Sequence, residues 1–267
     1  MSAVEIRGLS KSFAAGRSDA VDALADVDLT IEPGEFVSLI GPSGCGKSTA
    51  LRLIGNLLEP TAGEVLVNGK PARQARLDQD YGISFQQAGL FDWRSVAQNI
   101  ELPLELKGWD KKARRARALE VLDLVNLPEF ADHLPWQLSG GMQQRVAIAR
   151  ALAVHPPLLL MDEPFGALDE MTRERMQDEL LRICGETSTT VVFVTHSIPE
   201  AVYLSTRVVV MSPRPGRIRT VVDVGLGSDR GVETREAVAF FEKVTEVREA
   251  LRGIGAFEEA GAEVVDR

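Results

Sequence analysis

A glycine-rich loop in this chain reads Gly41-Pro42-Ser43-Gly44-Cys45-Gly46-Lys47-Ser48, followed by Thr49. It matches the pattern G-x-x-x-x-G-K-[ST] at every required position. A short apolar strand is predicted over Glu35 to Ile40 before the loop, and a helix from about Lys47 to Leu57 after it. In such loops backbone N–H groups surround phosphates, the lysine reaches the terminal phosphates and the hydroxyl binds Mg²⁺. The stretch therefore predicts a phosphate site between a strand and a helix.

The pattern around this loop alternates strands with helices, which indicates a parallel sheet covered on both faces. Strands are predicted at Val4–Leu9, Leu24–Ile31, Glu64–Val67, Tyr81–Phe85, Leu158–Met161, Thr190–Thr195 and Val208–Met211. Asn68-Gly69 predicts a hairpin turn. Between about residues 87 and 137 the pattern becomes helical, with Ser95–Leu106 and Lys111–Val125 as helices. In the second of these, the apolar set is expected to be Leu119, Val121, Leu122 and Val125.

Composition narrows the class of protein. The chain has 267 residues, of which 45% are hydrophobic, so it can bury a sizeable core. Its net charge of −9 argues against nucleic acid as the main partner, because a phosphate backbone requires a basic surface. The N-terminus does not read as a signal peptide, and no apolar run approaches the roughly 20 residues of a membrane span. The two cysteines lack the spacing of a metal site or a disulfide pair.

A second chemical element is the pair Asp162-Glu163 at the end of the apolar strand Leu158–Met161. Ligands of open α/β sheets bind where strands end. Asp162 is a candidate for holding Mg²⁺, and Glu163 for accepting a proton from an attacking water. A strand end that carries a solvated acidic pair is common, so these two roles are favoured only because the chain also contains the phosphate loop.

A further helix start reads Leu138-Ser139-Gly140-Gly141-Met142-Gln143-Gln144-Arg145. Ser139 is a natural N-cap, and the two glycines let backbone N–H groups approach a ligand closely. These N–H groups and the helix dipole make a second anion site. One chain thus carries two helix starts suited to phosphate.

Together these motifs resemble the nucleotide-binding subunit of an ATP-binding-cassette (ABC) transporter, in order and spacing over residues 3–222. Leu138–Arg145 is similar to the family signature without departure. The resemblance implies further roles: Gln86 as the Q-loop glutamine and Mg²⁺ ligand, Ala167-Leu168-Asp169 as the D-loop, and His196 as the γ-phosphate sensor. It also implies that Phe13 stacks on adenine. Taken alone, Phe13 would more often be core, His196 a strand-end histidine and Gln86 a surface amide.

The resemblance implies an α/β fold: a RecA-like P-loop NTPase core with an N-terminal antiparallel β subdomain and a helical insertion at about 87–140. The ATPase domain would span residues 1–222, and residues 223–267 a short extension, helical between Val232 and Arg252. Lys47, Ser48, Gln86 and Asp162 would position ATP and Mg²⁺. Ser139, Gly140, Gly141 and Asp169 would complete the site of a second copy in a two-fold dimer.

The implied function is ATP hydrolysis at the cytoplasmic face of the membrane, coupled through permease subunits and indirectly to a solute-binding protein. Importer subunits of the nitrate, sulfonate and taurine group have segments similar to Pro164–Asp169 and Gln143-Gln144-Arg145. Alternatives are an exporter subunit, a soluble ABC machine on nucleic acid or ribosomes, or a non-hydrolysing scaffold. The charge argues against the second, and Glu163 with His196 against the third.

The sequence allows two different roles for each of two further segments. Ala88–Arg94 carries three large apolar residues, which either pack the helical insertion or line a groove for a helix of the permease. The basic run Lys111–Arg117 could touch anionic lipid or a partner, although a solvated helix face is favoured. The cargo is not readable, because the transported molecule never touches this subunit.

Overall fold

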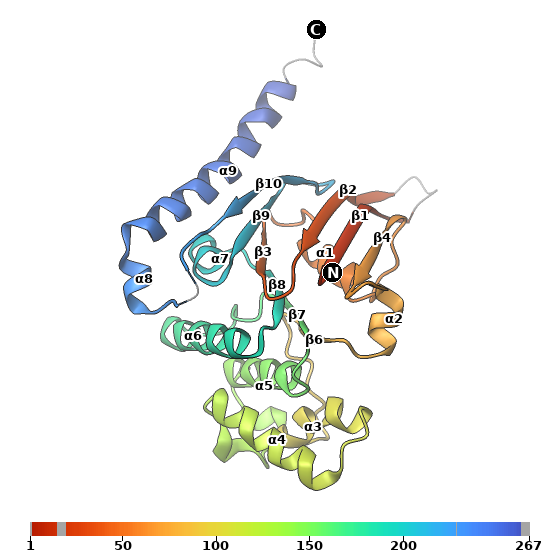
Figure 1. Cartoon of the computed structure of the whole chain (residues 1–267), viewed down its shortest axis with the longest axis vertical. Helices are drawn as coiled ribbons and strands as arrows, with labels where there is room; N and C mark the ends of the chain where they lie inside the picture. The colour runs from red at the N-terminus through yellow and green to blue at the C-terminus, as the bar shows by residue number, and fades with distance from the viewer. Residues whose placement is uncertain (1, 15–19, 228, 263–267) are drawn as a thin grey trace. The chain divides into compact units, whose positions relative to one another are not determined.

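The computed structural model describes residues 2–14, 20–227 and 229–262, with side chains up to residue 252. The chain divides into two compact units (Figure 1). The first unit comprises Met1–Asp78 and Val191–Arg267, and the second comprises Gln79–Thr190. The chain therefore leaves the first unit after Asp78 and returns to it at Val191. In the part of the chain described, no helix combines the length and apolar character that a bilayer crossing requires.

The first unit contains an antiparallel sheet with the strand order β2-β1-β4-β5. Its strands are β1 (Val4–Phe13), β2 (Val21–Ile31), β4 (Ala62–Val67) and β5 (Lys70–Pro71). Towards the end of β2, buried Val27, Leu29 and Ile31 alternate with exposed polar residues, as the sequence predicts for a sheet with one face covered. Asn68 and Gly69 join β4 to β5 with φ of 50° and 75°. Two successive positive φ values confirm the predicted hairpin turn.

The same unit contains a second sheet, in which β8 (Thr190–Val194), β3 (Phe36–Ile40), β9 (Arg207–Met211) and β10 (Ile218–Asp223) follow one another. The central strand β3 pairs in parallel with β8 on one side and β9 on the other. All five β3 residues are buried, which is typical of a strand covered on both faces. The helices of this part are α1 (Lys47–Ile54), α2 (Ala72–Leu77) and α7 (Ile198–Leu204). Because β3 and β8 run in parallel, the loops that follow them begin at the same sheet edge.

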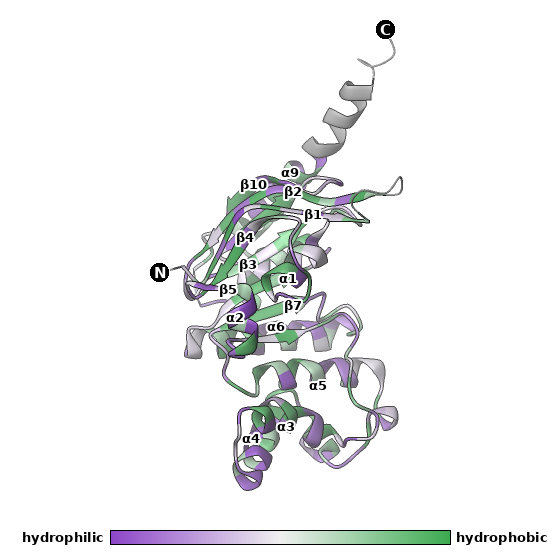
Figure 2. Ribbon diagram, turned by 90° about the vertical axis from the view of Figure 1, so that its right-hand side faces the viewer, coloured by the Kyte–Doolittle hydropathy of each residue, from purple (hydrophilic) through white to green (hydrophobic). Residues whose placement is uncertain are grey.

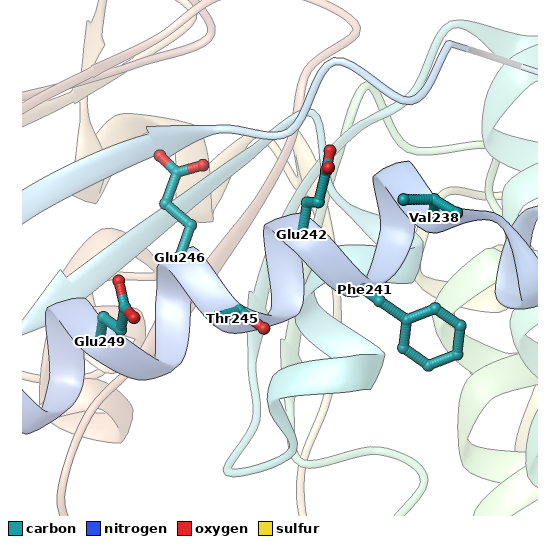
Figure 3. Close-up of a pocket in the computed structure, with 6 residues that line it drawn as sticks. All are labelled: Val238, Phe241, Glu242, Thr245, Glu246 and Glu249. Carbon is teal, nitrogen blue, oxygen red and sulfur yellow. The ribbon is translucent and has the colours of Figure 1, made fainter.

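The chain continues into two helices, α8 (Val232–Glu236) and α9 (Val238–Ala262), separated at Ala237 where the backbone is extended. One face of α9 buries Phe240, Val244 and Val247, and the helix contacts α7, β9 and β10. The outward face carries side chains around a shallow hollow (Figure 3): Val238, Phe241, Glu242, Thr245, Glu246 and Glu249. An apolar stripe of α9 thus packs against the rest of the first unit.

The second unit joins two parallel strands, β6 (Tyr81–Ser84) and β7 (Leu158–Asp162), to a group of helices. These are α3 (Val96–Leu106), α4 (Lys111–Leu124), α5 (Gly140–Leu152), α6 (Glu170–Thr187) and the 3₁₀ turns η1 (Pro128–Phe130) and η2 (Pro135–Gln137). Ser95 caps α3 in a reciprocal arrangement with Gln98, which explains the sharp start of that helix. Helices α3, α4 and α5 pack against one another.

The apolar stripe of α4 differs from the predicted one in one residue. Leu119 is 40% exposed, whereas Ala118, Val121, Leu122 and Val125 are buried. The buried residues have the spacing i, i+3, i+4 and i+7, which places them on one side of a helix. Leu119 is one residue past Ala118 and so points about 100° away from the stripe. Its inclusion in the predicted core was wrong.

The basic run on α4, largely purple in Figure 2, is not a uniform solvated face. Lys111 and Lys112 are exposed, but Arg117 is buried. The Arg117 guanidinium donates from Nε to Ala153 O (3.0 Å) and from Nη2 to Leu152 O (3.2 Å), at the C-terminal end of α5. A planar guanidinium suits the last carbonyls of a helix, which lack partners within that helix. The favoured interpretation was therefore wrong for Arg117, whose role is to cap α5.

Candidate functional site

The glycine-rich loop joins the buried strand β3 to α1 and curls around the ammonium of Lys47. Lys47 Nζ donates to Gly41 O (2.8 Å) and to Pro42 O (2.9 Å). The lysine side chain is buried, whereas Pro42 itself is exposed. The ammonium is thus held by loop carbonyls at the edge of the sheet, where phosphate oxygens can replace or join them.

Two glycines of this loop adopt left-handed backbone conformations, Gly44 with φ of 76° and Gly46 with φ of 100°. A Cβ atom on Gly46 would lie 2.8 Å from Ala23 O and 2.6 Å from Leu24 Cδ2. Only glycine satisfies both constraints, since a side chain would collide with β2 as well as strain the backbone. The loop is therefore pressed against the antiparallel sheet.

Gly46 is the N-cap of α1 and offers no side chain to the N–H groups of the first turn. The first turn contains no acidic residue, and Ser48 and Thr49 lie within it, both half-buried. An uncapped helix start without negative charge is suited to an anion. Cys45 is fully buried, and its N–H donates to Pro42 O (3.3 Å) to close the loop. Its thiol therefore points into the protein interior.

Phe13 is the last residue of β1, in the same unit. Its ring is 39% exposed, and the Lys11 ammonium lies 5.3 Å from the ring centroid. The exposure rules out a core role for this ring, which is one of the two interpretations that the sequence left open. An exposed aromatic face is suited to stacking against a planar ligand.

His196 follows β8, the parallel neighbour of β3. Leu39 in β3 lies opposite Val194 in β8, and the Thr195 N–H donates to Leu39 O (3.4 Å). His196 itself is exposed. Because the glycine-rich loop leaves β3 one residue after Ile40, this histidine and the loop emerge from adjacent strands at one sheet edge.

The acidic pair lies in the second unit, where β7 ends. Asp162 is 4% exposed, whereas Glu163 is half-buried. Glu163 has φ of 47°, an uncommon backbone conformation for a residue with a side chain. Its Oε2 accepts a hydrogen bond from Gln86 Nε2 (3.3 Å). The fold thus brings together two predicted site residues that lie 77 positions apart in the chain, and backbone strain of this kind is concentrated at functional sites.

The second helix start is formed as the sequence predicts, at the beginning of α5. Ser139 is the N-cap, and its Oγ accepts from Met142 N (3.3 Å). Ser139 and Gly140 are exposed. Apart from the two adjacent residues and the nearby helix backbone, no atom of the described chain lies within 4 Å of a Cβ added at Gly140. Packing within this chain therefore does not require a glycine at this position.

Helix α5 also holds the segment that contains Gln86. Gln144 Nε2 donates to Phe85 O (2.8 Å), and Arg150 donates from Nη1 to Gly89 O and from Nη2 to Ala88 O, both at 2.8 Å. Burial lowers the pKa of Arg150, but the group stays charged at neutral pH. Arg150 is not among the residues predicted from the sequence, because nothing local marks an arginine whose partners are two backbone carbonyls about 60 residues away.

Asp169 begins α6 as its N-cap, with Oδ1 accepting from Thr172 N (2.9 Å). The hydrogen bonds from Thr172 hold the pKa of Asp169 below its usual value, and the charge of Arg145 on α5 adds to this effect. Asp169 is exposed and therefore ionised at neutral pH. It presents a fixed negative charge beside the start of a helix.

In the segment Ala88–Arg94, some apolar side chains pack within the protein and one is left exposed. Trp93 is 75% exposed, whereas Leu90 and Phe91 are half-buried. The Phe91 and Trp93 rings lie 4.9 Å apart, and Asn99 accepts from Phe91 N (2.7 Å) and donates to Phe91 O (3.2 Å). The backbone of the segment is thus fixed while the indole of Trp93 remains open to contact.

Comparison with known proteins identifies close relatives along most of the chain. The taurine import ATP-binding protein TauB of Rhizobium johnstonii is 46% identical over 91% of this chain and 92% of its own length. The nitrate import ATP-binding protein NrtD of Synechocystis is 43% identical over 94% of this chain and 95% of its own. A solved dimer of the ATP-binding cassette MJ0796, bound to ADP and Pi, matches with a TM-score of 0.76 and 39% identity. This match covers 85% of this chain and 99% of that one.

The solved cassette confirms the predicted fold class, a P-loop NTPase core with an antiparallel β subdomain and a helical insertion. A family model described as ABC transporter matches residues 24–166, more than half of the chain. That stretch contains the glycine-rich loop, Gln86, the signature turn and Asp162-Glu163. The chain belongs to the ABC transporter family.

Proposed function

We propose that this chain is the ATP-binding and ATP-hydrolysing subunit of a bacterial ABC importer, and that ATP-driven closure of a dimer is its output. The observation that carries the proposal is the exposed start of α5 at Ser139 and Gly140. Gly140 has space around it that this chain does not fill. A helix start built for phosphate, with a glycine that internal packing does not require, fits a ligand brought by another molecule.

In this proposal the loop Gly41–Gly46 surrounds the ATP phosphates, and Lys47 contacts the β- and γ-phosphates. The hydrogen bonds of the Lys47 ammonium to two carbonyls of the same loop support this placement. Phe13 supplies the exposed ring on which adenine stacks. Thr49, in the first turn of α1, lies with Ser48 beside the N–H groups that receive the phosphates.

Mg²⁺ would be held by Ser48, Gln86 and Asp162. A hydroxyl, an amide oxygen and a carboxylate are the hard oxygen donors that this ion prefers. The described residues contain no cluster of three or more acidic, histidine or cysteine side chains that would form a complete metal cage. The three proposed donors, with one carboxylate among them, fit Mg²⁺, which typically uses one or two carboxylates together with substrate phosphates and water. When bound, the ion would neutralise charge on the phosphates.

Glu163 is proposed as the base that accepts a proton from the attacking water. Gln86 is proposed as the residue that orients the Glu163 carboxylate. The hydrogen bond between them supports this pairing. His196 is proposed to contact the γ-phosphate, since it emerges beside the phosphate loop from the parallel strand β8. A positioned donor at that phosphate stabilises the charge that develops during transfer.

The proposed dimer is two-fold and head-to-tail. The phosphate loop of one copy faces Ser139, Gly140 and Gly141 of the other, and Asp169 couples the two sites. ATP then favours the closed dimer by as much as it binds that state better than the open one. The dimeric ADP- and Pi-bound cassette at 39% identity supports this assembly.

The partners in this proposal are permease subunits and, through them, a solute-binding protein on the opposite side of the membrane. The names of TauB and NrtD support import. The subunit would act at the cytoplasmic face, with Trp93 and its neighbours in Ala88–Arg94 receiving a helix of the permease. We assign the ATPase domain to residues 1–222, its helical insertion to about 87–140 and a helical extension to 223–267.

The test of this function is Glu163→Gln, which preserves volume and removes the carboxylate. ATP binding should persist, turnover should collapse, and ATP should trap a dimer that gel filtration resolves from the monomer. Glu170→Gln, an exposed substitution of the same kind on α6, is the matched control and should hydrolyse ATP normally. Wild-type turnover in the Glu163→Gln variant would refute the role of Glu163.

A further inference from the structure

Three hydrogen bonds among Thr195, Ser197 and Glu200 form a closed ring of contacts around the backbone of His196. The Thr195 hydroxyl donates to Glu200 Oε2. The Ser197 N–H donates to Thr195 Oγ1 (3.0 Å), and the Glu200 N–H donates to Ser197 Oγ (3.4 Å). His196 lies between the two residues that this ring fixes, and its own side chain is exposed. The backbone on both sides of the histidine is therefore restrained by side chains.

The buried positions of Thr195 and Glu200 restrict these three hydrogen bonds to one arrangement. Thr195 is 1% exposed and Glu200 is 8% exposed. A hydroxyl has a single proton, and here it is given to the carboxylate, which leaves an oxygen lone pair to accept from Ser197 N–H. Glu200 thus determines which way the Thr195 hydroxyl points, and the hydroxyl in turn holds the peptide after His196.

Glu200 itself is anchored on a fixed helix. It lies in the first turn of α7, which contacts β3, β9 and α9. At the other end of α7, Arg230 Nη1 donates to Tyr203 O (2.5 Å) and to Val202 O (3.4 Å), so the last carbonyls of the helix are capped. Arg235 lies over the Tyr203 ring at 3.4 Å. The C-terminal extension therefore holds the helix that presents Glu200.

We propose that Glu200, acting through the Thr195 hydroxyl, is a positioning residue for His196. This inference rests on the proposed function, in which His196 contacts the γ-phosphate. The pair does not touch the nucleotide. It keeps the loop in the conformation from which the imidazole reaches the phosphate, so its loss lowers turnover rather than nucleotide affinity.

The experiment compares Thr195→Val with Thr195→Ser in the purified full-length chain, measuring steady-state hydrolysis of Mg-ATP. Valine has the shape of threonine without the hydroxyl, whereas serine keeps the hydroxyl. Thr195→Val should lower kcat by about 10- to 100-fold, by analogy with the loss of residues that orient metal ligands. The KM for ATP should stay near the wild-type value, and Thr195→Ser should restore most of kcat.

A second variant covers the case in which Thr195→Val does not fold. Glu200→Gln keeps the volume and a neutral acceptor, so kcat should fall in the same direction by a smaller factor. The matched control is Ser205→Ala, which removes a buried hydroxyl at the far end of α7 that lies 2.5 Å from Ser38 Oγ. Ser205→Ala should lower the melting temperature and leave kcat unchanged.

His196→Ala separates this inference from the proposed function. If His196→Ala loses turnover while Thr195→Val and Glu200→Gln keep it, the positioning role is refuted and the role of His196 stands. If His196→Ala hydrolyses ATP at the wild-type rate, the positioning role of Glu200 and the proposed role of His196 are both refuted. Equal losses in kcat for Thr195→Val, Thr195→Ser and Ser205→Ala, following stability alone, would also overturn the inference.

Discussion

Gln86 donates its side-chain amide to Glu163 Oε2 across 3.3 Å, and so links the segment after β6 to the residue after β7. Both strands belong to the second unit and pair in parallel, with Ser84 opposite Met161. The parallel register explains the contact, because each residue follows its strand by one or two positions. The base proposed for hydrolysis is therefore hydrogen-bonded to the glutamine that is also proposed to bind Mg²⁺.

Replacing Gln86 by alanine should lower ATP turnover by about 10- to 100-fold, the range typical of losing a residue that supports a metal site. The physical reason is that the Glu163 carboxylate loses an amide donor and the proposed Mg²⁺ site loses an oxygen ligand. Steady-state hydrolysis of Mg-ATP measures the effect, with Gln87→Ala as the control because Gln87 is the adjacent exposed glutamine. Equal activities in the two variants would contradict the pairing.

Replacing Ser139 by arginine should block ATP-dependent dimerisation and leave nucleotide binding by the monomer intact. The larger side chain would occupy the space in front of the first turn of α5, where the nucleotide of the second copy is proposed to bind. Gel filtration with ATP, in the Glu163→Gln background, measures dimer formation. Ala116→Arg adds the same charge at an exposed position of α4 and should dimerise normally. A dimer of unchanged stability in Ser139→Arg would remove the basis for the shared site.

Replacing Arg150 by methionine should loosen the segment around Gln86. Ala88 O and Gly89 O would each lose a donor at 2.8 Å, and a lost partner in a partly buried site costs about 1–3 kcal/mol. Hydrogen exchange at residues 86–94 should accelerate, and stimulation of turnover by the permease should fall. Arg182→Met, which removes only exposed ion pairs on α6, is the control. Unchanged exchange in Arg150→Met would show that the segment is held by other contacts.

Replacing Arg117 by methionine should destabilise the protein without a direct effect on nucleotide binding. The carbonyls of Leu152 and Ala153 would lose their donors, with an expected loss of about 2–3 kcal/mol in the free energy of unfolding. Urea unfolding measures the change. Lys112→Met, at an exposed position of the same helix, should remain within about 0.5 kcal/mol of wild type. Similar stabilities for both variants would restore the interpretation of a solvated basic face.

The sequence alone was sufficient to locate features that are built from short, contiguous patterns. The glycine-rich loop, the pair Asp162-Glu163 and the turn at Ser139–Gly141 each depend on residues adjacent in the chain, with local backbone requirements such as the left-handed Gly46. Spacing of apolar residues located most of the strands, but it missed β5 and β10. It failed at Leu119, because a one-residue error in the phase of a helix moves a side chain by about 100°.

Only the tertiary structure decided which distant groups meet. The contacts of Gln86 with Glu163, of Arg150 with Ala88 and Gly89, and of Arg117 with the end of α5 join residues 35 or more positions apart. Two of these use backbone carbonyls as acceptors, which every residue possesses and which therefore leave no mark in the sequence. The closed ring around His196 is the intermediate case. Thr195, Ser197 and Glu200 are close in sequence, but the strand and helix that hold them made the threonine hydroxyl turn towards a buried carboxylate.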